Sequence, residues 1–362
     1  MSDIPVLVVD VGSASLKAGY AGDDSPVTVI PSTAQKCAKG MEVMEDPGFG
    51  NDESEFESRK SFHPVQRGLV KDWEMLESLW RIMLDDIGIV SSDTTSVMIT
   101  ESPVASPADR SKWAEMLFES YRVPSIYIAN SSSLSLFASG RTTGLVVESG
   151  AGVTSTVPVF EGLALQHAAT TVNYAGQDVS EKVKSLLWEK DISVDLGYAR
   201  MLKERMAYVR TDTASRSNQD NVNFSLPDGT DVSASGNIFG DCTEKLFFNI
   251  DAEPNGLVHQ ANESLQLCDD SLQKDLANNV VISGGTSMLP GFGDRLESEM
   301  TKLVKKNATR SQRNLKVRVI PSSSHREAGY TSQRKTAAWI GGSIISSLDT
   351  FKQIKITRQE WK

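Results

Sequence analysis

Residues Ser139–Gly162 read SGRTTGLVVESGAGVTSTVPVFEG, and they predict two strands joined by a tight turn. Gly144–Val147 is an apolar run of strand type, 148–152 is the turn, and Val153–Phe160 then alternates apolar residues with polar ones. Glycine lets the turn reach backbone conformations closed to other residues and approach a ligand closely. Successive turn N–H groups that point one way form an anion cradle. The carboxylate of Glu148, at the lip of this turn, can hold a metal ion through water.

The N-terminus repeats this design. Val6–Val9 is an apolar strand, 10–15 is a turn that begins with Asp10, and 16–22 leads out as a second strand. Both hairpins share one register, which is an apolar strand, an acid, one residue and then glycine. Two such hairpins in one chain indicate a duplicated domain that holds phosphate between the copies. A third glycine turn, Ser283–Thr286, follows a later apolar strand and strengthens the prediction of nucleotide binding.

Longer motifs in the chain resemble those of actin and the actin-related proteins. They come in that family's order and cover nearly the whole chain. The residues that carry the resemblance include DVGSASLKAGYAGDD (Asp10–Asp24), LVKDW (Leu69–Trp73), ITESP (Ile99–Pro103), GVTSTVPVFEG (Gly152–Gly162), SGGTSMLPG (Ser283–Gly291) and WIGGSIISSLDTF (Trp339–Phe351). The sequence therefore resembles a divergent member of this family.

The resemblance implies the α/β actin-like ATPase fold, in which duplicated ribonuclease-H-like halves with four subdomains surround a nucleotide cleft. The first half is expected at 1–138 plus 330–362, with a small outer subdomain at about 32–66. The second half is expected at 139–329, with an outer subdomain at about 175–263. The composition agrees, because 362 residues are enough for two domains with sizeable cores.

The expected ligand is ATP or ADP with Mg²⁺, which favours water and phosphate oxygens held by one or two carboxylates. Asp10 and Glu148 are the expected metal residues, acting through water, and Lys17 is expected to reach the phosphates. The N–H groups offered to the phosphates belong to two loops, Gly12, Ser13, Ala14 and Ser15 in one, and Gly150, Ala151, Gly152 and Val153 in the other. By resemblance the adenosine end lies among Gly176, Lys203, Glu204, Gly284, Gly285, Thr286, Met288 and Lys335.

Hydrolysis is expected to be weak or absent, with residual ATPase activity at most. Actin orients the attacking water with a glutamine and a histidine, and Ser131 and Ser155 stand at those two positions here. Both side chains are short, neither is a base near neutral pH, and the Ser131 hydroxyl is given no role at this stage. Loss of orientation costs on the order of 10²-fold in rate. No catalytic residue is therefore assigned.

The composition argues against several other classes of function. A formal net charge of −10 and a pI of about 5.1 disfavour direct binding to nucleic acid or to anionic membranes. The three cysteines and four histidines show no metal-ligand spacing, and no apolar run approaches the length of a membrane span.

Local patterns predict helices at 72–87, 107–121, 131–139, 200–209 and 335–348. Residues 32–61 lose apolar periodicity and gain acids, and by resemblance they contain the loop that actin inserts into the next filament subunit. This loop is shorter and more acidic here, which predicts poor homofilament formation. Residues 321–334 are expected to form a loop longer than the family usually has at this place.

Three functions remain open at this stage. The favoured one is a structural subunit of a cytoskeletal or other multiprotein assembly, with actin, actin-related proteins or a larger complex as protein partners. The second is a polymerising actin-like cytoskeletal ATPase, and the third is a sugar-kinase-type enzyme of the same superfamily. A kinase needs a substrate-facing carboxylate beyond the two metal acids, and none stands out. The expected location is the cytoplasm and its cytoskeleton, with the nucleus as an alternative.

Overall fold

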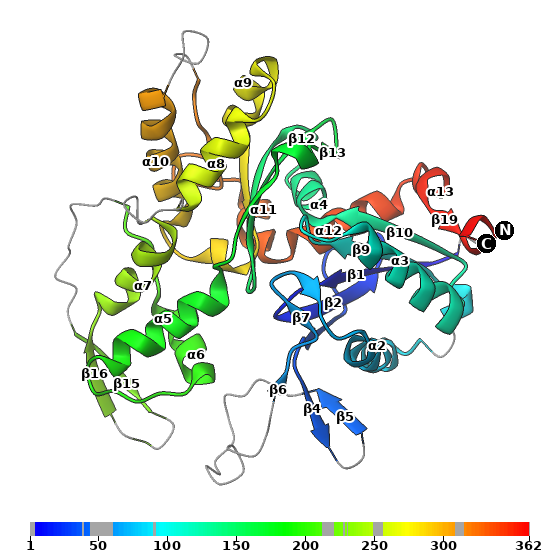
Figure 1. The fold of residues 1–362 in the computed structure, drawn as a ribbon, viewed down its shortest axis with the longest axis horizontal. Coiled ribbons are helices and arrows are strands. Elements are labelled where there is room, and N and C mark those ends of the chain that lie inside the picture. The colour runs from blue at the N-terminus through cyan, green and yellow to red at the C-terminus, as the bar shows by residue number, and fades with distance from the viewer. Residues whose placement is uncertain are drawn as a thin grey trace.

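The computed structural model describes residues 4–37, 40–43, 61–89, 92–211, 221–226, 229, 231–248, 256–307 and 315–361. Two mixed sheets and the helices around them make up most of these residues, and the two sheets lie in separate halves of the molecule (Figure 1). The described residues begin and end in the first half. Within the described residues no helix is both long and apolar enough to cross a membrane.

The first sheet has the strand order β19-β10-β9-β1-β2-β3. Its central strands β1, β9 and β10 run parallel, and β2, β3 and β19 each pair with their neighbour in the antiparallel sense. All six residues of β9 are buried, as expected of a strand covered on both faces. The bounds are Val6–Val11 (β1), Ser15–Tyr20 (β2), Thr28–Pro31 (β3), Ser96–Glu101 (β9), Ser125–Asn130 (β10) and Ile356–Thr357 (β19).

The second sheet repeats this plan in the order β13-β12-β11-β17-β18, with β14 also paired to β12. An antiparallel hairpin, β11 with β12, again leads into two parallel strands, β17 and β18. Asp10 at the end of β1 and Glu148 near the end of β11 therefore occupy equivalent places, which confirms the duplicated fold. The bounds are Gly144–Ser149 (β11), Thr154–Phe160 (β12), Leu163–Ala164 (β13), Thr170–Val172 (β14), Val280–Ser283 (β17) and Val319–Ile320 (β18).

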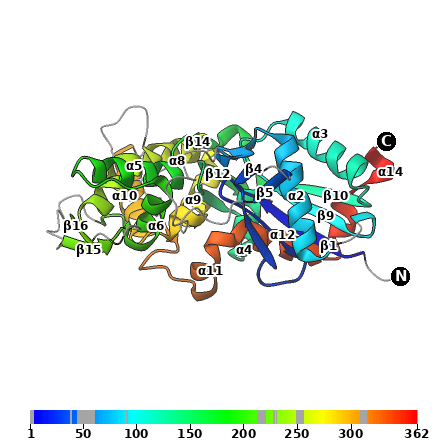
Figure 2. The ribbon, with the colours of Figure 1, turned by 90° about the horizontal axis from the view of Figure 1, so that it is seen from below.

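Alternation along the strands decides what each face of a sheet contacts. Leu7 and Val9 of β1 belong to the core formed with α2 (Trp73–Ile87) and α3 (Pro107–Glu115), whereas Val8 packs with Trp339 of α12 (Ala337–Ser347). Figure 2 shows α2 and α3 on one side of the first sheet and α12 on the other.

The second sheet follows the same rule. Leu145 and Val147 of β11 face the large core of the outer helices, while Val146 packs with Leu136 of α4 (Ser131–Ala138). The helices α4 and α12 cross between the two sheets and contact each other. Each sheet therefore rests one face on this central helix pair, which ties the halves together.

Smaller elements surround the two sheets. β4 (Ala34–Cys37), β5 (Gly40–Val43) and β6 (Ser61–Phe62) form one small sheet, and β15 (Asn221–Ser225) pairs with β16 (Asp231–Ser235) in another. The acidic residues 44–60 of the predicted outer loop lie outside the described residues. The remaining helices of the second half are α5 (Gly176–Trp188), α6 (Leu196–Met206), α7 (Ile238–Phe247), α8 (Leu257–Gln266), α9 (Asp270–Asn278) and α10 (Phe292–Asn307).

Three local predictions differ from the structure. The helix predicted at 200–209 is α6, which starts earlier because Asp195 caps it by accepting from the Tyr198 N–H at 2.6 Å. The helix predicted at 107–121 continues beyond Glu115 as a wider π-type turn, Met116–Ser120. The predicted loop 321–334 contains a helix, α11 (Ala328–Gln333), whose Tyr330 is buried against the second sheet and donates to the Ile282 carbonyl at 3.0 Å.

Candidate functional site

Asp10 is the penultimate residue of β1, just before the turn that leads into β2. In the β1–β2 register it stands opposite Lys17, and the Lys17 Nζ is 2.7 Å from Asp10 Oδ2. The Thr100 hydroxyl, at the equivalent height on β9, donates to Asp10 Oδ1 at 2.6 Å. Both carboxylate oxygens therefore have a donor, and the Lys17 side chain is only 11% exposed, so the pair is largely shielded from solvent.

Glu148 occupies the matching place in the second half, next to the start of α4. The Ser131 and Ser132 hydroxyls donate to its Oε2 at 2.8 and 3.1 Å. Burial raises the pKa of Glu148 above its usual value, the hydrogen bond from Ser131 opposes the rise, and the negative charge of Asp10 adds to it. The charges of Asp10 and Lys17 both act on Glu148, so the two hairpins bring these groups into one electrostatic environment.

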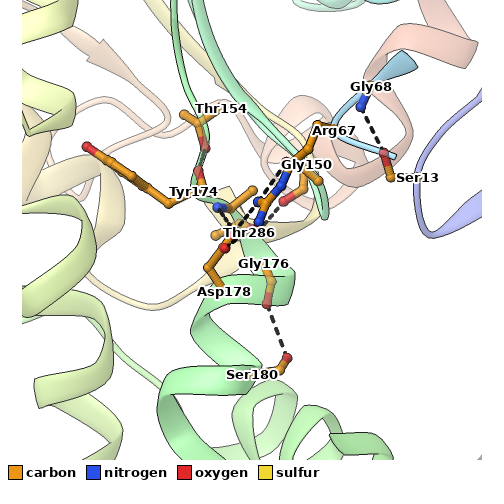
Figure 3. Close-up of polar contacts among 12 residues, drawn as sticks. Ser13, Arg67, Gly68, Gly150, Thr154, Tyr174, Gly176, Asp178, Ser180 and Thr286 are labelled. Atoms are coloured by element: carbon orange, nitrogen blue, oxygen red, sulfur yellow. Dashed lines mark hydrogen bonds and ion pairs between the residues drawn. The ribbon is translucent and has the colours of Figure 1, made fainter. Parts of the chain in front are cut away.

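The turn of the second hairpin is held by its carbonyl groups, as Figure 3 shows in part. The Gly150 carbonyl accepts from the Thr286 hydroxyl at 2.6 Å and from the Gly176 N–H at 3.0 Å. The Ala151 carbonyl accepts from the Gln177 N–H at 2.8 Å. In a planar trans peptide each C=O points opposite to the next N–H. The N–H groups of Ala151 and Gly152 are thus directed away from α5, as an anion cradle requires.

The turns of the two hairpins approach each other very closely at Gly152. A Cβ atom added there would lie 2.5 Å from Ser13 Oγ and 3.0 Å from the Arg67 backbone nitrogen. Ser13 Oγ in turn accepts from the Gly68 N–H at 3.1 Å (Figure 3). Glycine is therefore required at 152 because neighbouring backbone and side chain leave no room, which gives a physical reason for the glycine in this motif.

Sequence reasoning missed Arg67. It follows β7 (Val65–Gln66) and precedes β8 (Leu69–Val70), in a two-residue turn where Arg67 and Gly68 both have positive φ, 51° and 76°. A positive φ is unfavourable for arginine. Its guanidinium binds Asp178 at both carboxylate oxygens, at 2.5 and 2.7 Å, and donates to the Gly152 carbonyl at 3.1 Å.

This ion pair joins elements of the two halves beside the two hairpin turns (Figure 3). Asp178 lies in the first turn of α5, where its Oδ2 also accepts from the Ala175 N–H at 2.7 Å. The two residues are 111 positions apart, so neither segment of the sequence indicates the other. A charged residue followed by glycine, Arg67-Gly68, was the available signal for a tight turn.

Residues predicted for the adenosine end also gather in space. Lys203 Nζ donates to the Gly176 carbonyl at 3.1 Å, and the charge of Lys335 acts on Lys203. A Cβ on Gly285 would lie 4.0 Å from the Lys335 side chain. Burial lowers the pKa of Lys203 to about 8. Thr286 is buried beside Gly176, while Met288 is exposed.

The structure gives Ser131 a partner that sequence reasoning did not. Its hydroxyl is engaged with Glu148, and its side chain is buried. Ser155 is also buried, 2% exposed, and stands directly opposite Glu148 in the β11–β12 register. The Ser131 hydroxyl, to which the sequence assigned no role, therefore has a hydrogen-bond partner, because the Glu148 side chain reaches the start of α4.

The family model described as Actin matches residues 1–201 and 196–362. The chain belongs to the actin family. The two matched segments together span the whole chain, and actin-family proteins typically bind nucleotide and Mg²⁺.

The Arg67–Asp178 pair makes a prediction about nucleotide release from this actin-family chain. Removing the guanidinium in Arg67→Ala breaks a link between the halves and should lower the barrier to nucleotide release by about 1–2 kcal/mol. The effect is limited to this size because the Arg67 side chain is 41% exposed, so solvent partly screens the ion pair. Release of a fluorescent ATP analogue should then be about 5–30-fold faster. Arg81→Ala is the matched control, because Arg81 pairs with Glu77 at 2.7 Å on the surface of α2. Equal release rates for Arg67→Ala and the unmodified protein would contradict a bridging role.

Proposed function

We propose that this chain binds Mg-ATP or Mg-ADP between its two hairpins and acts as a structural subunit of a cytoskeletal or other multiprotein assembly. The observation that carries the proposal is the meeting of Asp10, Lys17 and Glu148 from equivalent hairpins of the two halves. A ligand bound there contacts both halves at once. Nucleotide then acts as a brace for the fold, and protein partners receive a fixed arrangement of the two halves.

The donor set fits the nucleotide. Asp10 and Glu148 would hold Mg²⁺ through water, since this ion keeps several waters and accepts one or two carboxylates. The bound ion would neutralise charge on the phosphates. Lys17 would add a point charge, and the outward N–H groups of the second turn would complete the phosphate cradle. Lys203, Thr286 and Lys335 would surround the adenosine end.

We further propose that hydrolysis is weak or absent. Orienting the attacking water needs an acceptor that reaches into the space beyond the terminal phosphate. Ser131 is directed to Glu148 instead, and Ser155 has a short hydroxyl side chain in a nearly fully buried position. Neither hydroxyl is a base at neutral pH, so proton removal from water has no assigned acceptor.

The experiment measures the nucleotide content of the purified protein and its turnover. Denaturing the protein and separating the supernatant by chromatography should yield a stoichiometric amount of ATP or ADP. Added MgATP at 100 times its dissociation constant should stabilise the fold by about 2.7 kcal/mol. Phosphate release in a single turnover should be on the order of 10²-fold slower than for ordinary actin measured alongside. An empty protein with no thermal shift would refute nucleotide binding, whereas turnover as fast as actin would refute only the loss of hydrolysis.

A further inference from the structure

Two consecutive serines at the start of α4 bind the same oxygen of one acid. Ser131 Oγ and Ser132 Oγ donate to Glu148 Oε2 at 2.8 and 3.1 Å. Both serines are buried, at 6% and 0% exposure. Within the described part of the chain Glu148 Oε1 accepts no hydrogen bond. One oxygen of this carboxylate therefore has two donors and the other has none.

The start of α4 is itself fixed, which makes this contact rigid. The Asn130 side chain caps the helix by accepting from the Ser132 and Ser133 N–H groups, at 3.0 and 3.4 Å. Leu134, one turn further on, lies against the backbone of Gly341 in α12. Neither serine can follow a moving carboxylate without disturbing the helix start. Hydroxyl donors to an ionised acceptor are also stronger than neutral pairs, so they hold the charged carboxylate in place.

We propose that Ser131 and Ser132 are positioning residues for the magnesium contact of Glu148. By occupying Oε2 they leave Oε1 as the single oxygen that meets a water of the ion. The Glu148 side chain is long enough to reach the helix. An aspartate at 148 would be one methylene shorter and would not reach as far. This inference rests on the proposed nucleotide site and adds two residues that set how its metal is held.

A structural role and a positioning role of these serines predict different effects of Mg²⁺ on ATP binding. A purely structural role, in which Glu148 helps to fix the start of α4, would alter stability and nucleotide affinity whether or not Mg²⁺ is present. A positioning role alters mainly the dependence of nucleotide affinity on Mg²⁺. Removing groups that orient a metal ligand commonly costs 10–100-fold in metal affinity.

The test compares Ser131→Ala, Ser132→Ala and the double variant with Ser135→Ala. Ser135 lies in the same helix at 0% exposure, and its hydroxyl has no partner within the described residues, so it is a matched control. Binding of ATP is titrated at a series of Mg²⁺ concentrations and in excess EDTA. The double variant should need about 10–100-fold more Mg²⁺ for half-maximal tightening of ATP binding, with each single variant in between. Affinity for ATP in EDTA should stay within about twofold of the unmodified protein, as it should for Ser135→Ala.

Three outcomes decide the matter, and thermal unfolding of each variant shows which ones are folded. An unchanged Mg²⁺ requirement in the folded variants overturns the positioning role while the proposed function stands. An equal loss of ATP affinity with and without Mg²⁺ also overturns it, in favour of a structural role. An unmodified protein whose ATP binding ignores Mg²⁺ overturns both the inference and the proposed metal site. Should the double variant fail to fold, Ser131→Ala alone gives the same comparison, because it removes the shorter of the two hydrogen bonds.

Discussion

Asp10→Ala is expected to empty the nucleotide site and to lower the free energy of unfolding by about 3–5 kcal/mol. The stability loss arises because Lys17, whose side chain is 11% exposed, loses its partner at 2.7 Å. The Thr100 hydroxyl loses its acceptor in the same change. The nucleotide loss has a separate cause, because one of the two proposed metal carboxylates is gone. Urea unfolding and nucleotide content after purification measure the two effects independently.

A second variant separates these two causes. In Asp10→Ala/Lys17→Met both charges are removed, and replacing a buried pair by apolar groups is often neutral for folding. The double variant should therefore recover most of the stability but none of the nucleotide. Asp349→Ala removes an equally negative but fully exposed side chain, at 101% exposure, and should change neither quantity. Nucleotide retention by Asp10→Ala equal to that of Asp349→Ala would show that Asp10 serves folding alone.

The paired hairpins could be predicted from the sequence because their chemistry is local. An apolar strand, an acid and a glycine turn lie within a few positions of one another, and the same order occurs at Asp10 and at Glu148. The faces of β1 could not be assigned in the same way, because Val6–Val9 is apolar throughout, and only the structure separates Val8 from Leu7 and Val9. Because the same local pattern occurs twice, it predicts both the duplicated fold and the equivalent positions of the two acids.

The contacts of the site could not be predicted, because they join segments that are far apart in the sequence and meet only in the folded chain. Arg67 and Asp178 lie 111 positions apart, and neither segment alone indicates the other. The Ser131 hydroxyl appeared to have no role because the reach of Glu148 across to α4 is a tertiary property. Likewise the helix inside 321–334 depends on Tyr330 finding a buried place against the second sheet.

Gly341→Ala is expected to be the most disruptive small substitution in the central helix pair. A Cβ atom there would lie 1.9 Å from the Leu134 carbonyl oxygen and 2.5 Å from the Leu134 carbonyl carbon. Those atoms are backbone of α4 and cannot rotate away, so the two helices must separate. Overpacking a core usually costs 1–3 kcal/mol, and a clash with backbone should cost about 3 kcal/mol or more. Urea unfolding should show the loss as a lower midpoint at an unchanged slope.

Gly329→Ala is the matched control for this prediction. Gly329 lies in α11, and a Cβ atom there would meet nothing within 4 Å. Alanine is the better helix former by up to about 1 kcal/mol, so this change should be neutral or slightly stabilising. Both positions are helical glycines, and only the approach of a second helix differs between them. Equal stability of the two variants would show that α4 can shift away from α12 at little cost.

The Gly341→Ala variant also tests whether the helix crossing supports the metal site. Separation of the two helices displaces Leu134, and with it the start of α4 that carries Ser131 and Ser132 three and two residues earlier. Any folded fraction of Gly341→Ala should therefore bind ATP with a weakened dependence on Mg²⁺. Gly341 has no side chain with which to contact Glu148 or Asp10, so this effect must pass through α4. A folded variant with an unchanged Mg²⁺ requirement would mean that α4 moves as a rigid unit with β11. In that case the second half alone, rather than the crossing with α12, holds Glu148 and its two serines in register.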